Sequence, residues 1–516
     1  MILKSNSNLL KNQCPECGGL HPASSHFLPD LPQEPIELID DLVKMGIYSD
    51  KVLSLGRDFT NQKLREALLF KTIANGDVEK ENIYRELIQQ AGGIDAAFEA
   101  AFGHKSDEFF RDTIRASRFS RRQFLKQVGA VATLIALANC SQAETEEIFD
   151  LNAPIRLEKN KLKIGFLPIS CATPILTSKY LGFYEKYGLE VELVKMNSWS
   201  EVRDGAISEE LDAYHMLSPM PLAITLGLGS RPYPIKLACI QNLNGSAITV
   251  AMKHKEKVNK PENFKGFTIA IPFVYSMHNL LLRYYLAAGN LNPDKDVNII
   301  TLSPLQMVNK LRIGEIDAFI VAEPFNQIAV SKKAGFIQIL TKDIWPQHPC
   351  CSFAASKNWI DEHPNTFRTL NKAIIEASSY ASNRGNRRQV AREIAAPEYV
   401  GAPVEILEAV LTGVFEDGLG NLRDVPDFID FDPYPWKSFS YWITTQLVRW
   451  NLTSGNLEHE EIADEVFLTG IARQLAKKLG QEPPTLILDY ERLKYDLFDP
   501  TEPNNYLEEQ IKKYGF

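Results

Sequence analysis

Short apolar runs recur along the chain from residue 161 to residue 340, and patterns typical of helices separate most of them. The first run, residues 161–168, is followed by Pro174, which opens a helical pattern that extends to Gly188. The other runs span residues 191–194, 213–217, 235–240, 247–252, 267–271, 297–302, 317–322 and 336–340. Strands that alternate with helices in this way predict mostly parallel sheets with helices on both faces, the arrangement of the α/β class.

Two other parts of the chain are dominated by helical patterns. Residues 36–115 carry apolar side chains three and four positions apart, which predicts a small helical module over residues 1–115. Beyond residue 357, helical patterns recur and strand-like runs are few; they cover residues 366–382, 404–415, 438–450 and 462–479. We expect this C-terminal part to wrap or complete the first portion of an α/β domain that spans residues 161–516.

Composition narrows the class of protein. With 516 residues, 45% of them hydrophobic and 23% charged, the chain can form more than one domain with a sizeable core. The net charge of −9 argues against nucleic acid as a partner, because nucleic-acid binders concentrate positive charge on one face. The seven cysteines are too few and too irregularly placed for a disulfide framework in a chain of this length.

Residues 116–142 resemble a bacterial export signal. Residues 120–126 read Ser-Arg-Arg-Gln-Phe-Leu-Lys, which is nearly the twin-arginine pattern, and the apolar or small residues 128–138 follow. This stretch is too short to span the ~30 Å of membrane hydrocarbon as a helix, but it suits the apolar region of a signal. An ordinary amphipathic helix with an arginine pair is the alternative.

Cys140 ends a stretch similar to a lipoprotein box, in which the cysteine becomes the lipidated N-terminus. Asn139 stands where such a box has a small residue, so lipidation of Cys140 and a plain linker or buried cysteine both stay open. Residues 143–160 are polar and acidic, which predicts a flexible linker.

The segment before the signal contains a candidate metal turn. Cys14 and Cys17 are two residues apart and could grip one tetrahedral zinc ion, with His21 and His26 completing the ligand set. A second Cys-x-x-Cys is missing and the histidine spacing is compressed, so a solvent-exposed turn is the alternative. Because the export signal begins only after residue 115, we expect residues 1–115 to be a genuine additional module.

A set of motifs resembles the nitrate-binding and bicarbonate-binding proteins of cyanobacterial-type ABC transporters. These motifs are residues 165–168 (GFLP), 179–189 (KYLGFYEKYGL), 215–221 (HMLSPMP), 282–289 (LRYYLAAG), 322–326 (AEPFN), 345–349 (WPQHP) and 434–438 (YPWKS). The resemblance covers about residues 160–500. It implies a two-lobed fold of the type II periplasmic-binding-protein kind, with the second lobe over about residues 250–345. It also implies separate ABC permease and ATPase subunits as partners.

The resemblance further implies candidate ligand-binding residues. Trp199 matches the family's pocket tryptophan, which supplies a flat apolar wall and an indole N–H donor, although a core tryptophan would also fit. His278 matches the family's ligand-contacting histidine and is expected just after a strand, where open α/β sheets place ligand contacts. Ser218 and Ser246 would offer hydroxyl groups to the same cleft, and Glu323 lies in a shared motif. Turns rich in such residues also occur without any ligand.

Two of the candidate positions depart from the family pattern. Ser246 stands where nitrate binders have a glutamine, and Cys351 stands where they have a lysine. Bicarbonate binders have an acid at that second position, which works with a calcium ion, and a thiol is no hard oxygen ligand. A buried anion is expensive without a cation or several donors around it. We therefore expect nitrate to bind weakly and include Cys351 among the residues that decide selectivity.

Three classes of function are compatible with these features. The first and preferred class is a solute-binding component of an importer for a small anion or related solute. The second is a ligand sensor with residues 1–115 as its output. The third is an enzyme that uses Cys350 and Cys351 as nucleophile or soft-metal site. The chain has no G-x-S-x-G, H-E-x-x-H or P-loop motif, which argues against an enzyme. It also has no apolar run of ~18 residues, so we expect the permease to be separate.

The twin-arginine stretch predicts location. A functional signal places the protein on the periplasmic side of the inner membrane, with a lipid anchor if Cys140 is modified, and an unused signal leaves it in the cytoplasm. Replacing Arg121 and Arg122 together by lysine keeps the charge but removes the arginine pair, and should retain the protein inside the cell. Fractionation followed by immunoblotting measures this, and an unchanged distribution would contradict the export signal.

Overall fold

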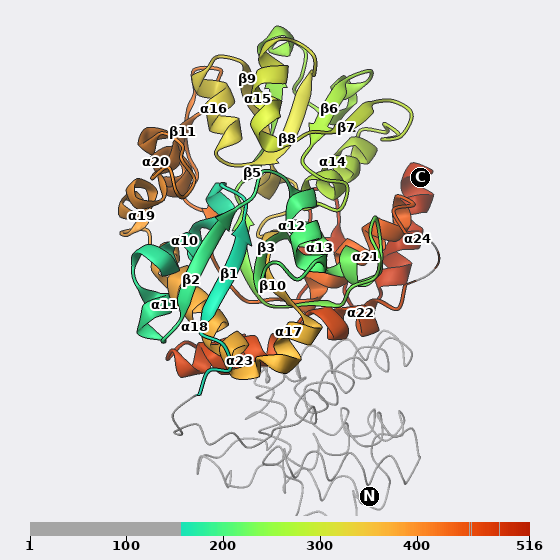
Figure 1. The fold of residues 1–516 in the computed structure, drawn as a ribbon. Coiled ribbons are helices and arrows are strands. Elements are labelled where there is room, and N and C mark those ends of the chain that lie inside the picture. Colours follow the sequence, from blue (N-terminus) through green and yellow to red (C-terminus); the bar gives the residue numbers. More distant parts are fainter. Residues whose placement is uncertain (1–155, 454, 456, 485) are drawn as a thin grey trace, which may run out of the picture. The chain divides into compact units, whose positions relative to one another are not determined.

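The computed structural model describes residues 156–453, 455, 457–484 and 486–516. The predicted helical module, the export signal, Cys14, Cys17 and Cys140 lie outside the described residues. The described part forms two α/β lobes (Figure 1). Within it, no helix has both the length and the apolar character needed to cross a membrane.

Lobe 1 is built on a six-stranded sheet with the order β13-β4-β10-β3-β1-β2. Strands β1, β2 and β3 are parallel, whereas β10 lies antiparallel between β3 and β4. The strands are β1 (Lys161–Phe166), β2 (Glu190–Lys195), β3 (Ala213–Leu217), β4 (Ile235–Asn244), β10 (Pro349–Ser356) and β13 (Ile429–Asp430). Every residue of β3 and β10 is buried, so both faces of the sheet are covered there.

Lobe 2 is built on a five-stranded sheet with the order β7-β6-β8-β5-β9. Strands β6, β7 and β8 are parallel, and β5 runs antiparallel to both of its neighbours. The strands are β5 (Ser246–Ala251), β6 (Thr268–Ile271), β7 (Asn298–Thr301), β8 (Ala318–Ala322) and β9 (Gly335–Leu340).

Both sheets are mixed, so the prediction of mostly parallel sheets is corrected. The chain leaves lobe 1 after β4, forms lobe 2 from β5 to β9, and returns to lobe 1 with β10. A strand that enters a lobe starts at the junction and runs away from it, whereas the parallel strands run toward it. The antiparallel strands β5 and β10 are therefore the direct result of the two crossings.

The helices cover the sheets, and three of the sequence predictions need correction here. The helix expected from Pro174 to Gly188 is two helices separated at Gly182, which has φ 72°. The pattern over residues 462–479 is also two helices, because Phe467 and Leu468 leave the helical conformation. Strand β10 was not predicted at all. The helices are α10 (Thr173–Tyr180), α11 (Phe183–Lys186), α12 (Trp199–Ile207), α13 (Pro219–Thr225), α14 (Met277–Ala288), α15 (Pro304–Arg312), α16 (Phe325–Ser331), α17 (Lys357–Glu362), α18 (Pro364–Ser382), α19 (Arg387–Ile394), α20 (Val404–Thr412), α21 (Lys437–Arg449), α22 (His459–Val466), α23 (Thr469–Lys478) and α24 (Pro503–Tyr514).

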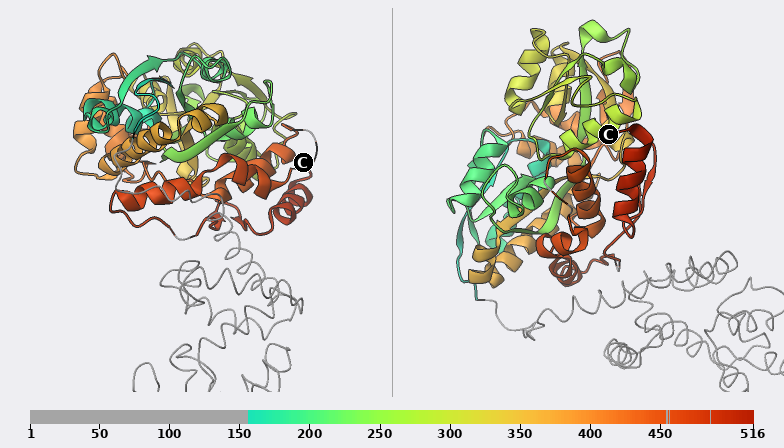
Figure 2. Two further views of the ribbon diagram at one scale, coloured as in Figure 1. Left: turned by 60° about the horizontal axis from the view of Figure 1, so that its bottom comes forward. Right: turned by 90° about the vertical axis from the view of Figure 1, so that its right-hand side faces the viewer.

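The C-terminal part contacts both lobes, which extends the expectation that it completes only the first. The ribbon of β11 (Val414–Glu416) and β12 (Leu422–Asp424) is followed by Phe428, whose ring packs with Ile337 of lobe 2 in one apolar cluster. The Ile337 N–H donates to the Asp417 carbonyl at 2.8 Å. Near the C-terminus, the Tyr495 N–H donates to the Tyr284 hydroxyl of α14 at 3.2 Å. The right-hand view of Figure 2 shows the red C-terminal helix beside the green part of lobe 2.

The first crossing between the lobes depends on one glycine. Asn244 and Gly245 both have positive φ, at 59° and 75°. The Gly245 N–H donates to the Phe428 carbonyl at 2.7 Å, and its carbonyl accepts from the Glu323 N–H at 3.0 Å. A Cβ at Gly245 would lie 2.8 Å from the Ile429 side chain. Glycine is therefore required here both for its backbone conformation and for the close approach.

Replacing Gly245 by alanine should destabilise the protein more than the same change at Gly266. Gly266 has φ 79° but no atom within 4 Å of an added Cβ, so Gly266→Ala costs only the left-handed conformation, about 1–2 kcal/mol. Gly245→Ala adds the clash with Ile429, about 1–3 kcal/mol more. Urea unfolding of both variants measures the difference, and equal losses would show that the close approach is relaxed at no cost.

Candidate functional site

The candidate site lies where the two lobes meet. Strands β1 and β3 of lobe 1 end at this junction, as do β6 and β8 of lobe 2, and helices begin just after them. The Ser170 N–H, in the 3-10 turn Ser170–Ala172 after β1, donates to the carbonyl of Glu323, after β8, at 2.9 Å. Carboxyl ends of parallel strands are where open α/β sheets bind ligands. The junction therefore combines the ligand-binding edges of both sheets.

Three of the predicted site residues come together in the middle of this junction. Ser246, the first residue of β5, has its Oγ 3.1 Å from the Nε2 of His278 and 3.6 Å from the Sγ of Cys350. His278 lies in the first turn of α14, which begins here because the Ser276 hydroxyl accepts from the Asn279 N–H. The neighbouring Cys351 has its Sγ 4.0 Å from that of Cys350.

The other three predicted residues are buried around this centre. Trp199, at the start of α12, meets the ring of His215 edge-on, with 5.3 Å between the ring centroids. The Ser218 N–H donates to the carbonyl of Cys350 at 3.0 Å. The Glu323 Oε2 accepts from the Gln327 N–H at 3.1 Å. All six side chains are thus excluded from solvent, at 2% exposure or less.

Many polar atoms of this junction are buried without a hydrogen-bond partner. They are Ser170 Oγ, Ser218 Oγ, Asn242 Oδ1, His278 Nδ1, Glu323 Oε1 and both ring nitrogens of His215 and of His348. Each such atom costs about 1–3 kcal/mol if it stays unpaired, and native proteins contain few of them. Their concentration at one place indicates that water or a ligand completes the site.

Burial keeps three ionisable groups of the junction uncharged near neutral pH: His215, His348 and Glu323. Burial lowers the pKa of His215 to about 3 and that of His348 to about 4. Burial also raises the pKa of Glu323 to about 8, although the Gln327 N–H stabilises its charged form. The site therefore offers donors and acceptors without a fixed net charge from these three residues.

No buried cation replaces the lysine that nitrate binders have at the position of Cys351. Among the described residues, the buried polar set contains no lysine and three arginines. Arg283 pairs with Asp294, Arg387 with Asp430, and Arg449 binds Gln510. Each of these arginines interacts with a residue outside the junction. Among the described residues, no buried arginine or lysine therefore compensates for the absence of a lysine at position 351.

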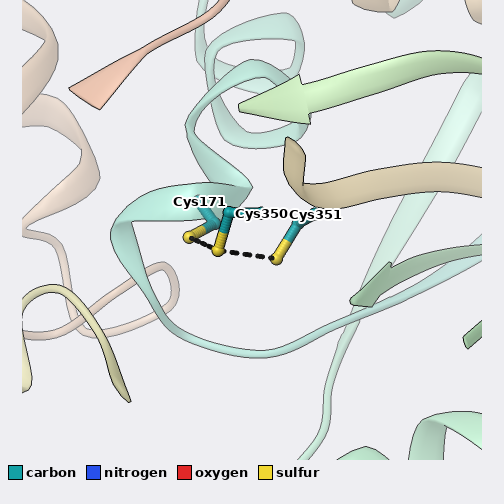
Figure 3. A group of neighbouring side chains, drawn as sticks. All are labelled: Cys171, Cys350 and Cys351. Carbon is teal, nitrogen blue, oxygen red and sulfur yellow. Dashed lines mark hydrogen bonds between the residues drawn. The ribbon is translucent and has the colours of Figure 1, made fainter. Parts of the chain in front are cut away.

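Sequence reasoning missed four residues of the junction as site residues: Cys171, His215, His348 and, for ligand binding, Cys350. Cys171 and Cys350 have their sulfur atoms 3.7 Å apart (Figure 3). Hydrogen bonds from Cys171 and Cys351 lower the pKa of Cys350, whereas burial raises the pKa of Cys171 and of Cys351. The sequence signal that could have identified the two histidines was their position, since His215 lies within the buried strand β3 and His348 directly precedes β10.

The two lobes and the ligand-binding edges between them define a solute-binding protein. Residues 156–395 match the model of the NMT1-like family. The chain is 30% identical over 440 residues to the nitrate/nitrite binding protein NrtA of Nostoc sp. (strain PCC 7120), an alignment that covers 76% of this chain and 99% of that protein. The chain belongs to the family of nitrate- and bicarbonate-binding proteins, as its motifs predicted.

Two further comparisons agree with this assignment. The chain is 34% identical over 373 residues to the nitrate import ATP-binding protein NrtC of Synechocystis sp., covering 68% of this chain but 55% of NrtC, so it spans about half the length of that relative. The crystal structure of the periplasmic nitrate-binding protein NrtA from Synechocystis PCC 6803 superposes with a TM-score of 0.66 at 26% identity, over 68% of this chain and 98% of that one. The predicted two-lobed α/β fold is confirmed.

The buried carboxyl of Glu323 should make stability depend on pH. The unfolded chain releases this proton near pH 4.5, whereas the folded protein keeps it to about pH 8, so stability falls as the pH rises between those values. Between pH 7 and pH 8 this loss amounts to about 1 kcal/mol. Glu323→Gln has no proton to lose and should abolish that slope in urea titrations.

Glu491→Gln is the matched control, because burial raises the pKa of Glu491 only to about 7. Ionisation of Glu491 therefore lowers stability mostly below pH 7, and this variant should keep most of the wild-type slope between pH 7 and pH 8. A wild-type protein with equal stability at pH 7 and pH 8 would show that Glu323 is ionised in the fold.

Proposed function

We propose that this protein is the solute-binding component of an ABC importer for a small solute of the nitrate, nitrite, bicarbonate and cyanate class. The observation that carries the proposal is the gathering of unpartnered buried polar atoms where the two lobes meet. A small solute enclosed there would satisfy them. Family membership supports the same role.

Six residues would hold the solute. Trp199 supplies an apolar wall from lobe 1, and His278 and Ser246 supply polar groups from lobe 2. Ser218 and Glu323 face them with an unpartnered hydroxyl and an unpartnered carboxyl oxygen. Cys351 replaces the expected cation. Because His215, His348 and Glu323 are neutral, the site favours a neutral or weakly charged solute, or an anion whose charge is met by neutral donors.

The protein would act by binding alone, without a catalytic step. Its partners would be a permease and an ATPase, since NrtC, a relative at 34% identity, is named an ATP-binding protein of nitrate import. It would work on the periplasmic side of the inner membrane, delivered by the signal at residues 116–142, with a lipid anchor if Cys140 is modified.

A solute panel with a matched pair of histidine variants tests this function. Full-length protein is screened with nitrate, nitrite, bicarbonate and cyanate by thermal shift, and the best solute is titrated by calorimetry. Nitrate should be bound weakly. His278→Ala should weaken the affinity for the best solute by about ten-fold or more, which corresponds to ~1.4 kcal/mol for one lost polar contact.

The control is His254→Ala, which removes a histidine of lobe 2 that pairs with Asp317 and does not contact the junction residues. Its affinity should equal that of the wild type. Equal losses in both variants, or no stabilisation by any solute of the panel, would contradict the proposed binding site.

A further inference from the structure

Three thiols meet at the centre of the junction. Cys171 comes from the turn after β1, and Cys350 and Cys351 come from the start of β10. The Sγ of Cys350 lies 3.7 Å from that of Cys171 and 4.0 Å from that of Cys351, and all three sulfur atoms lie within 4.8 Å of one another. Figure 3 shows Cys350 in the middle, with the three side chains turned to the same side. All three residues are fully buried.

An irregularity in β10 makes this arrangement possible. Successive side chains of a regular strand point to opposite faces, so Cys350 and Cys351 should point apart. The pairing of β10 with β4 shifts register between Pro349 and Cys351 and again between Cys351 and Ser352. A bulge of this kind interrupts the ladder and re-aims a side chain, and bulges are frequent beside functional sites. Here the bulge brings two adjacent thiols to the same cluster.

We propose that Cys171, Cys350 and Cys351 form a binding site for a soft, thiophilic metal ion, such as a monovalent copper ion or a divalent d10 ion. The proposal goes beyond the proposed function, because the three thiols would hold the ion at the same junction that is proposed to bind the solute. Three thiolates are the ligand set that soft ions prefer, whereas hard ions need carboxylate or carbonyl oxygens.

The distances between the thiols fit a common metal ion with little movement. With metal–sulfur bonds of ~2.3 Å, two coordinating sulfur atoms are roughly 3.8 Å apart in a tetrahedral site and roughly 4.0 Å apart in a trigonal one. The two short separations, 3.7 Å and 4.0 Å, match these values. The third pair, which lies within 4.8 Å, needs only a small approach.

Metal binding would release protons from the thiols into a junction that also contains other polar groups. Only a thiolate ligates a metal, so each coordinating thiol gives up its proton. Unpartnered ring nitrogens of His215, His278 and His348 lie in the same junction, so polar groups surround the three thiols. The Ser246 hydroxyl links a histidine to the thiol cluster, because its Oγ is within hydrogen-bond distance of both His278 and Cys350.

Cys239 shows what a purely structural cysteine looks like in the same protein. It is equally buried, but it packs in a separate apolar cluster and donates to the Asn371 Oδ1 at 3.3 Å. No other cysteine belongs to that cluster of buried residues. Buried single cysteines of this kind behave as small apolar side chains. Cys239 therefore provides an internal control for the three-cysteine cluster.

Cadmium(II) is a suitable probe, because its thiolate charge-transfer absorbance reports sulfur ligands directly. The full-length protein is used with Cys14, Cys17 and Cys140 changed to serine, so that cysteines outside the described residues do not contribute. It is reduced with a phosphine and titrated with cadmium. Cys171→Ser, Cys350→Ser, Cys351→Ser and the control Cys239→Ser are made in this background. Native mass spectrometry gives the stoichiometry, and thermal melts establish that each variant is folded.

One cadmium ion per chain is expected. Each change within the cluster should weaken binding by more than about 100-fold, since even partners outside the ligand shell are worth roughly 10–100-fold, and Cys239→Ser should bind like its parent. X-ray absorption of the parent should find three sulfur neighbours, a measurement that needs no folded variant. Absent cadmium binding, equal binding by all variants, or fewer than three sulfur neighbours would overturn the site.

The solute panel separates this inference from the proposed function. If a solute of the panel binds to the metal-free protein while cadmium binding does not depend on the three thiols, the importer role stands and the metal site falls. If cadmium binds through the three thiols while no solute of the panel binds, the metal site stands and the proposed solute class falls.

Discussion

The site depends on the way the backbone passes between the two sheets. At the first crossing the Gly245 N–H donates to Phe428 and the Gly245 carbonyl accepts from the Glu323 N–H, so one residue ties the end of β4 to the C-terminal segment and to the end of β8. This fixes where β5 starts, and Ser246 with it. The return crossing places the start of β10 opposite, with Cys350 3.6 Å from the Ser246 hydroxyl. Polar groups from both lobes can face one another because β5 and β10, the strands that follow the two crossings, both begin at this junction.

Three groups that burial keeps uncharged, His215, His348 and Glu323, couple ligand binding to proton transfer. His215 and His348 are neutral because charging them inside the protein is expensive, and Glu323 keeps its proton for the same reason. An arriving anion favours proton uptake by a histidine, and an arriving cation favours proton release from the carboxyl or the thiols. The apparent affinity for any charged ligand therefore varies with pH, in opposite directions for the two signs of charge.

The sequence predicted the parts of the fold that depend on local pattern. Apolar runs located β1 to β9, because a buried strand needs consecutive apolar side chains wherever it lies. Strand β10 escaped prediction because its first residues, Pro349 and the two cysteines, show neither alternation nor β-branched side chains, and its burial is set by β3 and β4 on either side. Resemblance identified Trp199 and His278. The cluster around Cys350 could not be predicted, since Cys171 lies 179 positions away along the chain and a register shift in β10 orients the sulfur atoms.

The C-terminal part links the two lobes at points away from the two chain crossings. The ribbon after α20 bonds to Ile337, and the segment near the C-terminus bonds to Tyr284, so lobe 2 is fastened to elements that belong in sequence to lobe 1. A ligand enclosed at full burial can leave only when the lobes separate. Separation must therefore strain or break these hydrogen bonds in addition to the contacts of the ligand. The residence time of an enclosed solute is thus governed in part by residues 414–428 and 493–495, through their contacts with lobe 2.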